Sequence, residues 1–109
     1  MDLKQLGEVI AQYGKHGWTL RRVLLSSEPD DAVRAAAGDA EIRRGGQNAL
    51  WFSRRSRPDA EAWELRRLDG SPFALVAVIP DEADADEREE MLADTEEEML
   101  AAAPRMTGH

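Results

Sequence analysis

The sequence predicts an α+β fold, in which N-terminal and C-terminal helices pack on one face of a mostly antiparallel sheet of about four strands. Three observations support this prediction. Residues at helical spacing stand near both ends of the chain, β-branched and aromatic stretches of strand length lie between them, and short turn signals separate those stretches. With 109 residues, the chain has the usual length of one domain with one core, so we treat 1–109 as a single domain.

The first half of the chain predicts a helix, a strand and a second helix. Apolar residues recur at the spacing of one helical face over 2–13, and Gly14 follows where a left-handed cap residue commonly stands. The stretch WTLRRVLLS, residues 18–26, has the composition of a strand. Pro29 suits the first position of a short helix over 29–37.

The next segment predicts two strands joined by a tight turn. We expect a short strand at 41–44 and a longer one at 48–55. Gly45-Gly46 lies between them and is typical of a hairpin turn.

A second hairpin is expected further along. A strand over 61–68 precedes Asp69-Gly70, a strong hairpin signal, and PFALVAVI then forms the last strand at 72–79. This last strand is apolar on both faces, so we expect it inside the sheet with both sides sheltered. Either a helix of the same chain or a second subunit could provide the cover.

The C-terminal region predicts a long acidic helix over 84–103, with residues 104–109 frayed. Asp84 is a candidate cap, and Glu87 follows three residues later. Residues 81–109 hold eleven acidic and two basic side chains, whereas residues 1–80 hold eleven acidic and twelve basic ones. This end of the chain therefore carries a net charge of -9 and the rest a net charge of +1, which together give the net charge of -8.

Composition excludes several classes of protein. The chain has no cysteine, which removes disulfides, thiolate metal sites and thiol nucleophiles and fits a reducing compartment. No stretch approaches the ~20 apolar residues of a membrane span, and the N-terminus lacks a signal-peptide pattern. We expect a cytoplasmic protein outside the membrane.

Four pairs of adjacent arginines lie in or at the ends of the predicted strands. Successive strand residues point to opposite faces, so each pair is expected to send one guanidinium to each side of the sheet. The pairs are Arg21-Arg22, Arg43-Arg44, Arg54-Arg55 and Arg66-Arg67.

One possible register of the strands places several candidate binding residues on the same face of the sheet. If Leu50 and Phe52 face the core together with Trp63 and Leu65, the opposite face carries the set Trp51, Ser53, Arg55, Glu64 and Arg66. Guanidinium groups beside an aromatic ring can hold phosphates and stack on bases. Arginines also commonly pair with nearby carboxylates, and the acidic net charge opposes a polyanion, so nucleic acid is an unlikely partner.

The acidic helix offers a second candidate surface. Met91 and Met99 belong to a narrow apolar stripe that could dock on the sheet or enter a partner groove, where methionine gives adaptable contacts. The plainer alternative is a solvated helix on the outside of its own domain.

We expect no enzyme, cofactor or metal site. His16 and His109 are the only histidines and lack the spacing of a metal pair, and GKHG lacks the pattern of a phosphate-binding loop. The sequence therefore favours a non-enzymatic protein–protein interaction or adaptor module, acting on another protein or as a homodimer. Trp51, Arg55, Arg66, Met91 and Met99 are its candidate contact residues. Alternatives are nucleic-acid or anion binding by the arginine-tryptophan face, or small-molecule binding.

Overall fold

The computed structural model describes residues 2–70 and 72–107, with side chains as far as residue 102. The elements are α1 (Leu3–Lys15), β1 (Thr19–Leu25), α2 (Asp31–Ala37), β2 (Glu41–Arg44), β3 (Ala49–Arg57), β4 (Ala60–Arg67), β5 (Phe73–Pro80) and α3 (Ala85–Thr107).

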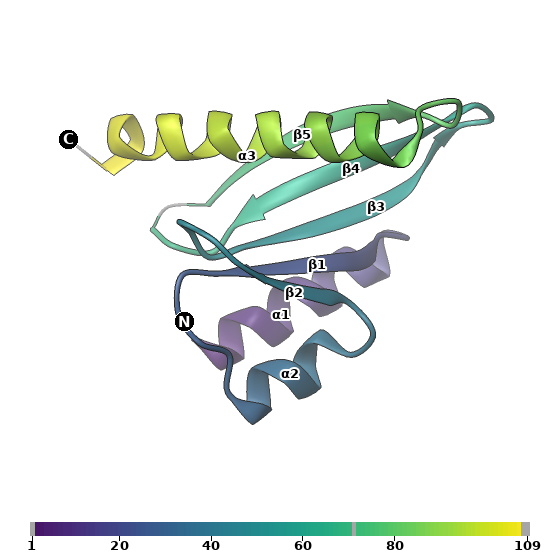
Figure 1. Ribbon diagram of the computed structural model, residues 1–109. Helices are drawn as coiled ribbons and strands as arrows, with labels where there is room; N and C mark the ends of the chain where they lie inside the picture. The colour runs from purple at the N-terminus through teal and green to yellow at the C-terminus, as the bar shows by residue number, and fades with distance from the viewer. Residues whose placement is uncertain (1, 71, 108–109) are drawn as a thin grey trace.

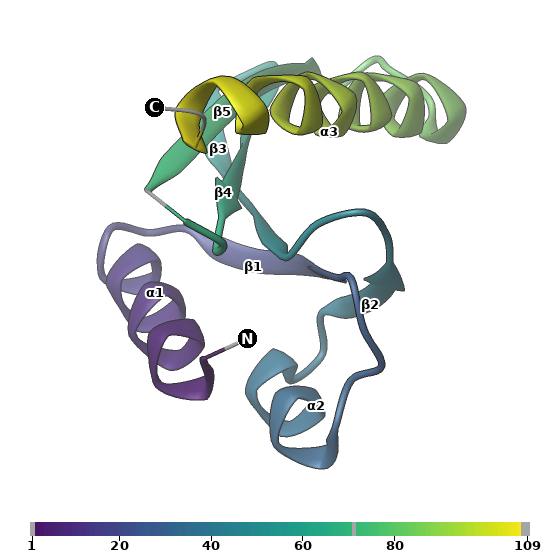
Figure 2. The same ribbon diagram turned by 90° about the vertical axis from the view of Figure 1, so that its left-hand side faces the viewer.

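The strands form one sheet in the order β2-β1-β3-β4-β5, with helices on both faces (Figures 1 and 2). Helices α1 and α2 cover one face, and α3 runs along the other over β5 and β4. The α+β class and the mostly antiparallel sheet packed by terminal helices are confirmed. The expectation that all helices share one face is wrong, because both faces of the central strands are apolar and each needs a cover.

The chain joins β1 to β2 through α2, and these two strands are parallel. The hairpin expected at Gly45-Gly46 is therefore wrong, because β3 pairs with β1 and not with β2. Parallel strands end at the same edge of the sheet, and the Gly45 amide donates to the carbonyl of Leu25 there at 2.8 Å. The loop after β2 then crosses the end of β1, so that β3 lies on the side of β1 away from β2.

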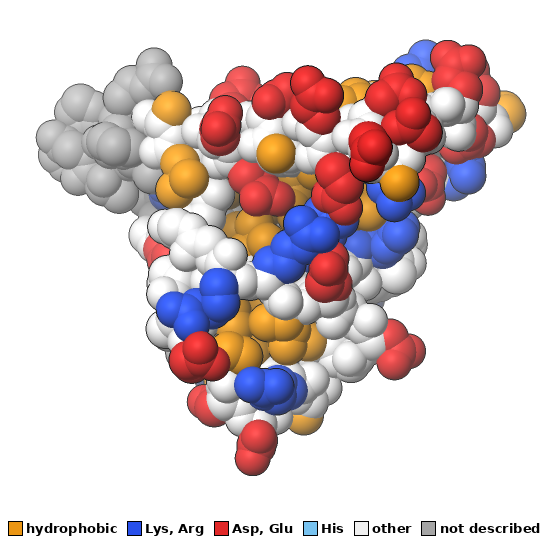
Figure 3. Space-filling model, viewed as in Figure 1, with side chains coloured by type: hydrophobic (Ala, Val, Ile, Leu, Met, Phe, Trp, Pro, Cys, Tyr) orange, Lys and Arg blue, Asp and Glu red, His pale blue; other side chains and the backbone are white. Residues whose placement is uncertain are grey.

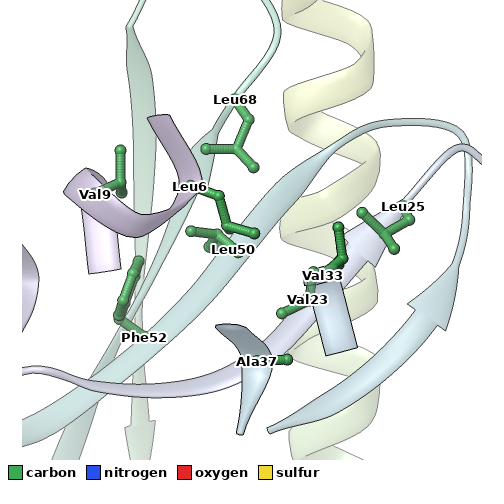
Figure 4. Packing of buried hydrophobic residues seen from close by; sticks show 9 residues of the cluster. All are labelled: Leu6, Val9, Val23, Leu25, Val33, Ala37, Leu50, Phe52 and Leu68. Carbon is green, nitrogen blue, oxygen red and sulfur yellow. The ribbon is translucent and has the colours of Figure 1, made fainter. Parts of the chain in front are cut away.

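One core cluster lies between the sheet and helices α1 and α2 (Figure 4). Leu6 and Val9 lie on one face of α1, as the helical spacing predicts. Tyr13, one turn further on, stacks on Phe52 of β3 with ring centroids 4.0 Å apart. The buried members are Leu6, Val9, Val23, Leu25, Val33, Ala37, Leu50, Phe52 and Leu68.

A second core cluster lies beneath α3. Leu92 and Met99, two turns apart on the helix, have no exposed surface. They pack with Trp51 and Trp63, whose rings meet edge to face with centroids 6.1 Å apart. The buried members are Leu24, Ala49, Trp51, Trp63, Leu65, Ile79, Leu92 and Met99.

The register of β3 and β4 differs from the predicted one. Trp51 lies opposite Leu65 and Ser53 lies opposite Trp63, and residues directly opposite each other share a face. Trp63 and Leu65 therefore face α3 together with Trp51, and do not lie beside Leu50 and Phe52. The prediction assumed that β3 has one buried face, whereas both of its faces are buried.

The last strand was expected inside the sheet, and this is wrong, because β5 is an edge strand. Its two sides differ. Ile79 and its neighbours on one side lie under α3, while Val76 and Val78 on the other side are 56% and 41% exposed. The helix α1 packs near β1, at a distance from this edge (Figure 2).

The ends of α3 follow and extend the prediction. The Glu87 amide donates to Asp84 Oδ1 at 2.8 Å, and the Asp84 amide donates to Glu87 Oε1 at 3.2 Å, which is the expected capping box. The helix continues to Thr107, so its expected end at residue 103 is wrong. Of the residues expected to fray, 108–109 lie outside the described residues.

We predict that the buried side of α3 contributes strongly to stability. Leu92→Ala removes a side chain with no exposed surface and should lower the free energy of unfolding by about 3 kcal/mol. Leu100→Ala is the control on the same helix, since Leu100 is 43% exposed, and should cost less than about 1 kcal/mol. Urea unfolding measures both variants, and equal losses would contradict the assignment of Leu92 to the core.

Candidate interaction surface

Two of the five candidate contact residues lie inside the protein. Trp51 and Met99 have no exposed surface and belong to the core beneath α3. Trp51 Nε1 donates to Glu96 Oε2 at 2.8 Å, which satisfies the indole within the same chain. In this fold neither side chain reaches the surface.

Arg55 and Arg66 lie on opposite faces of the sheet. Arg55 lies on the α3 side of the sheet, like Trp51 and Ser53, and is exposed. Its Nη1 donates to both carboxylate oxygens of Asp81, at 2.7 and 2.8 Å. Arg66 lies opposite Leu50, on the α1 side, and donates to the carbonyl of Arg67 at 2.7 Å. The expected row of tryptophan and arginine on one face is therefore wrong, because the register separates its members.

The arginine pair of β1 departs from strict alternation because the strand contains a bulge. The register shifts between Leu20 and Arg22, which leaves Arg21 as an extra residue. Arg21 donates to Ser53 Oγ at 3.0 Å and lies 4.5 Å from the Trp63 ring centroid. Arg22 turns to the same α3 side, so the prediction that this pair would split between the faces is wrong.

Arg22 is a nearly buried charge on that face. It is 7% exposed and pairs with Glu41 of β2 at 2.8 Å and with Glu89 of α3. The hydrogen bond from Arg22, and then its charge, hold the pKa of Glu89 below the ordinary value. Glu89 of the acidic helix thus pairs with arginines of two strands, since it also lies 3.5 Å from Arg43 of β2. Figure 3 shows the acidic side chains along α3 with basic ones directly below.

The polar side chains of α1 make contacts within the chain. Tyr13 donates to Glu64, and burial together with this hydrogen bond raises the pKa of the phenol, which keeps it protonated. His16 is exposed at the end of α1, and its Nε2 lies 3.3 Å from Nε2 of Gln12. Within residues 2–70 and 72–107, no group of three or more His, Asp or Glu side chains converges in a way that could hold a metal ion.

Shallow hollows follow the join between α1 and β4. One of about 190 Å³ is lined by Gln12, Tyr13, His16, Trp18 and Glu64. Another of about 310 Å³ includes Glu8 and Arg66. Ligand sites usually enclose about 300–1,000 Å³, so these hollows are at or below the small end of that range.

A cleft of about 270 Å³ lies on the opposite face, between the loop after β2 and α3. Arg43 and Arg44 border it, but Arg43 pairs with Glu41 at 3.1 Å and Arg44 with Glu28 at 2.7 Å. Both guanidinium groups already have carboxylate partners, which weakens the case for an anion site here.

The exposed side of β5 forms a bare apolar surface, which we call the open strip: Ala74, Val76 and Val78. Its residues lie opposite Arg66, Glu64 and Ala62 of β4, so it adjoins the hollows beside α1. The sequence signal for this surface was the unbroken apolar run of the strand. Its position at the edge was not evident, because that depends on the strand order.

The outer flank of α3 lies beside the same edge. Leu92 and Met99 face the sheet, while Glu89 and Glu96 reach toward Arg22 and Trp51 on the side of β1 and β3. The opposite side of the helix therefore lies toward β5. We call the exposed outer surface of the helix on this side the acidic flank, which consists of Glu87, Met91, Asp94 and Glu98. Arg88 lies beneath this flank, with its guanidinium carbon 5.9 Å from the centroid of the Trp63 ring. Met91 is half-buried, and the three carboxylates are exposed.

No family model matches the chain, and neither a curated protein nor a solved structure does. In the described part of the chain, no helix combines the length and the apolar character needed to cross a membrane.

We predict that Glu89 stabilises the fold through Arg22 in a pH-dependent manner. Glu89→Gln should lower the free energy of unfolding by about 1 kcal/mol at pH 7, because a nearly buried guanidinium loses one carboxylate. The Glu89 pKa is lowered by folding, so its contribution is full above the ordinary value of 4.5 and is lost as the pH falls below it. Urea unfolding of both proteins between pH 7 and pH 3 should show the difference shrinking.

The matched control is Glu28→Gln. This carboxylate pairs with Arg44 at 2.7 Å, but the Glu28 side chain is 82% exposed, so its loss should cost far less at every pH. A difference between wild type and Glu89→Gln that stays constant down to pH 3 would contradict the proposed pairing.

Proposed function

We propose that this chain is a non-enzymatic protein–protein interaction module that receives its partner at β5. The observation that carries the proposal is the open strip. Val76 and Val78 are large apolar side chains on an edge strand, 56% and 41% exposed, with no helix of the described chain above them. Contiguous apolar surface of this kind commonly marks an interaction site.

The neighbouring groups suit recognition of a polypeptide. The edge of β5 offers backbone hydrogen-bonding groups, and the hollows beside Tyr13 offer room for side chains. Met91 of the acidic flank remains a candidate contact, since it is half-buried at the same edge. In this proposal Val76 and Val78 replace Trp51 and Met99 as the apolar contacts.

The other functional classes have less support. A nucleic-acid or anion surface would need free arginines beside an exposed aromatic ring, but Trp51 is buried and Arg22 pairs with two carboxylates. A small-molecule site would need a more enclosed pocket than the hollows described above. Because the chain lacks cysteine, we also propose the cytoplasm as its compartment.

Site-specific photocross-linking tests the proposal. A photoreactive residue in place of Val76 should give adducts with a partner protein in the cells that contain this chain. The same residue in place of Ala32, which is exposed on α2 at the far end of the sheet, is the control. Equal adduct yields at the two positions would contradict the proposal.

A binding measurement then tests the role of the strip directly. The partner identified by cross-linking should bind the purified chain, and Val76→Lys should weaken that binding about tenfold, because a charge on an edge strand opposes pairing. Circular dichroism should show an unchanged fold, since Val76 is 56% exposed. Unchanged affinity in a folded variant would remove β5 as the docking surface.

A further inference from the structure

The edge of β5 lacks the usual features that prevent strand addition. Native edge strands are commonly protected by charged side chains, bulges or proline. The register between β5 and β4 has no shift, and residues 73–79 carry no charge and no proline. Pro80 stands only at the end of the strand. The geometry is therefore that of an edge able to accept another strand along seven residues.

The surroundings of this edge are acidic. On the α3 side, the acidic flank lies above it and carries the exposed carboxylates of Glu87, Asp94 and Glu98, while Arg88 is half-buried over the Trp63 ring. Asp69 precedes the strand and Glu82 follows it, and both are exposed. A segment that lies along β5 would enter a negative field at both ends and on one side.

We propose, on the basis of the proposed function, that the partner adds a sixth strand to β5 through an extended segment in which apolar and basic residues alternate. Side chains of a strand point alternately to the two faces of its sheet. Those on the α1 side would continue the open strip beside Val76 and Val78. Those on the other side would lie beside α3, where the negative field of the acidic flank favours lysine or arginine.

The same charges disfavour a second copy of this chain as the added strand. Pairing two β5 strands antiparallel and edge to edge gives one continuous sheet, in which both α3 helices lie on the same face. The two acidic regions, each with eleven acidic and two basic side chains over residues 81–109, would then stand side by side. Juxtaposed like charges oppose association, so the occupant belongs to another protein.

Peptide binding followed by nuclear magnetic resonance tests the inference. The probe is a ten-residue peptide of alternating valine and lysine, and its matched control alternates valine and glutamate. Titration into the isotope-labelled chain should shift the amide signals of β5 with the lysine peptide, and this effect should weaken as salt is added. The glutamate peptide should leave those signals unchanged.

Two triple variants separate the acidic flank from net charge. Neutralising the flank by E87Q, D94N and E98Q should weaken binding of the lysine peptide about tenfold. Glutamine at position 87 keeps the capping hydrogen bond. Neutralising E28Q, D31N and D39N changes the net charge equally, near α2, and should alter affinity less than twofold.

The outcomes distinguish this inference from the proposed function. Equal binding of both peptides, or equal weakening by both triple variants, would contradict the inference that the partner segment is basic. The proposal that β5 is a docking surface would then still stand. A dimer in analytical ultracentrifugation that Val76→Lys dissociates would overturn it in favour of a second copy. If no peptide shifts β5 and position 76 gives no cross-link above the control, both proposals fail.

Discussion

The burial of β3 on both faces is the constraint on which the rest of the structure depends. Leu50 and Phe52 pack toward α1 and α2, while Trp51 packs toward α3, and all three have no exposed surface. A strand enclosed in this way needs helices on both sides of the sheet. In the described residues, α1, α2 and α3 cover the central strands and leave one side of the edge strand β5 bare.

Electrostatics on the α3 side explain how a strongly acidic helix lies over a sheet. The bulge in β1 turns both Arg21 and Arg22 toward that face, and Glu89 and Glu96 of α3 meet Arg22 and the Trp51 indole. The carboxylates on this inner side are paired. Those of the acidic flank remain exposed, which directs the uncompensated charge of the helix toward the solvent and toward the β5 edge.

Local patterns predicted the order of most elements, because helix spacing and strand composition depend on neighbouring residues. The helix end at Gly14 and the helix start at Pro29 are wrong, since α1 continues to Lys15 and α2 begins at Asp31. The strand at 41–44 was predicted with the bounds of β2, and the Asp84 and Glu87 cap was predicted as observed. Strand order was not predictable, since it depends on contacts between distant residues. The Gly45-Gly46 turn fits a hairpin locally, but β2 is parallel to β1.

The candidate contact residues show the same limit. Trp51 was assigned to the surface because one buried face was assumed for its strand, although the apolar run Ala49 to Phe52 is typical of a strand buried on both sides. The bulge at Arg21 could not be read from the residues, because nothing in that stretch marks an extra position. Apolar character on both sides of the last strand did indicate a surface in need of cover, and this feature remains in the open strip.

The strand order also has a consequence for how the chain folds. Residues 19–44 make one unit, in which β1 and β2 pair across α2, and residues 49–80 make another, in which β3, β4 and β5 follow one another as a meander. Within the described sheet, the pairing of β1 with β3 joins the two units. Contacts within each unit connect residues that are close in sequence, and such contacts favour rapid folding. The kinetic nucleus is thus expected where Val23 meets Leu50, the junction at which two locally formed halves become one sheet.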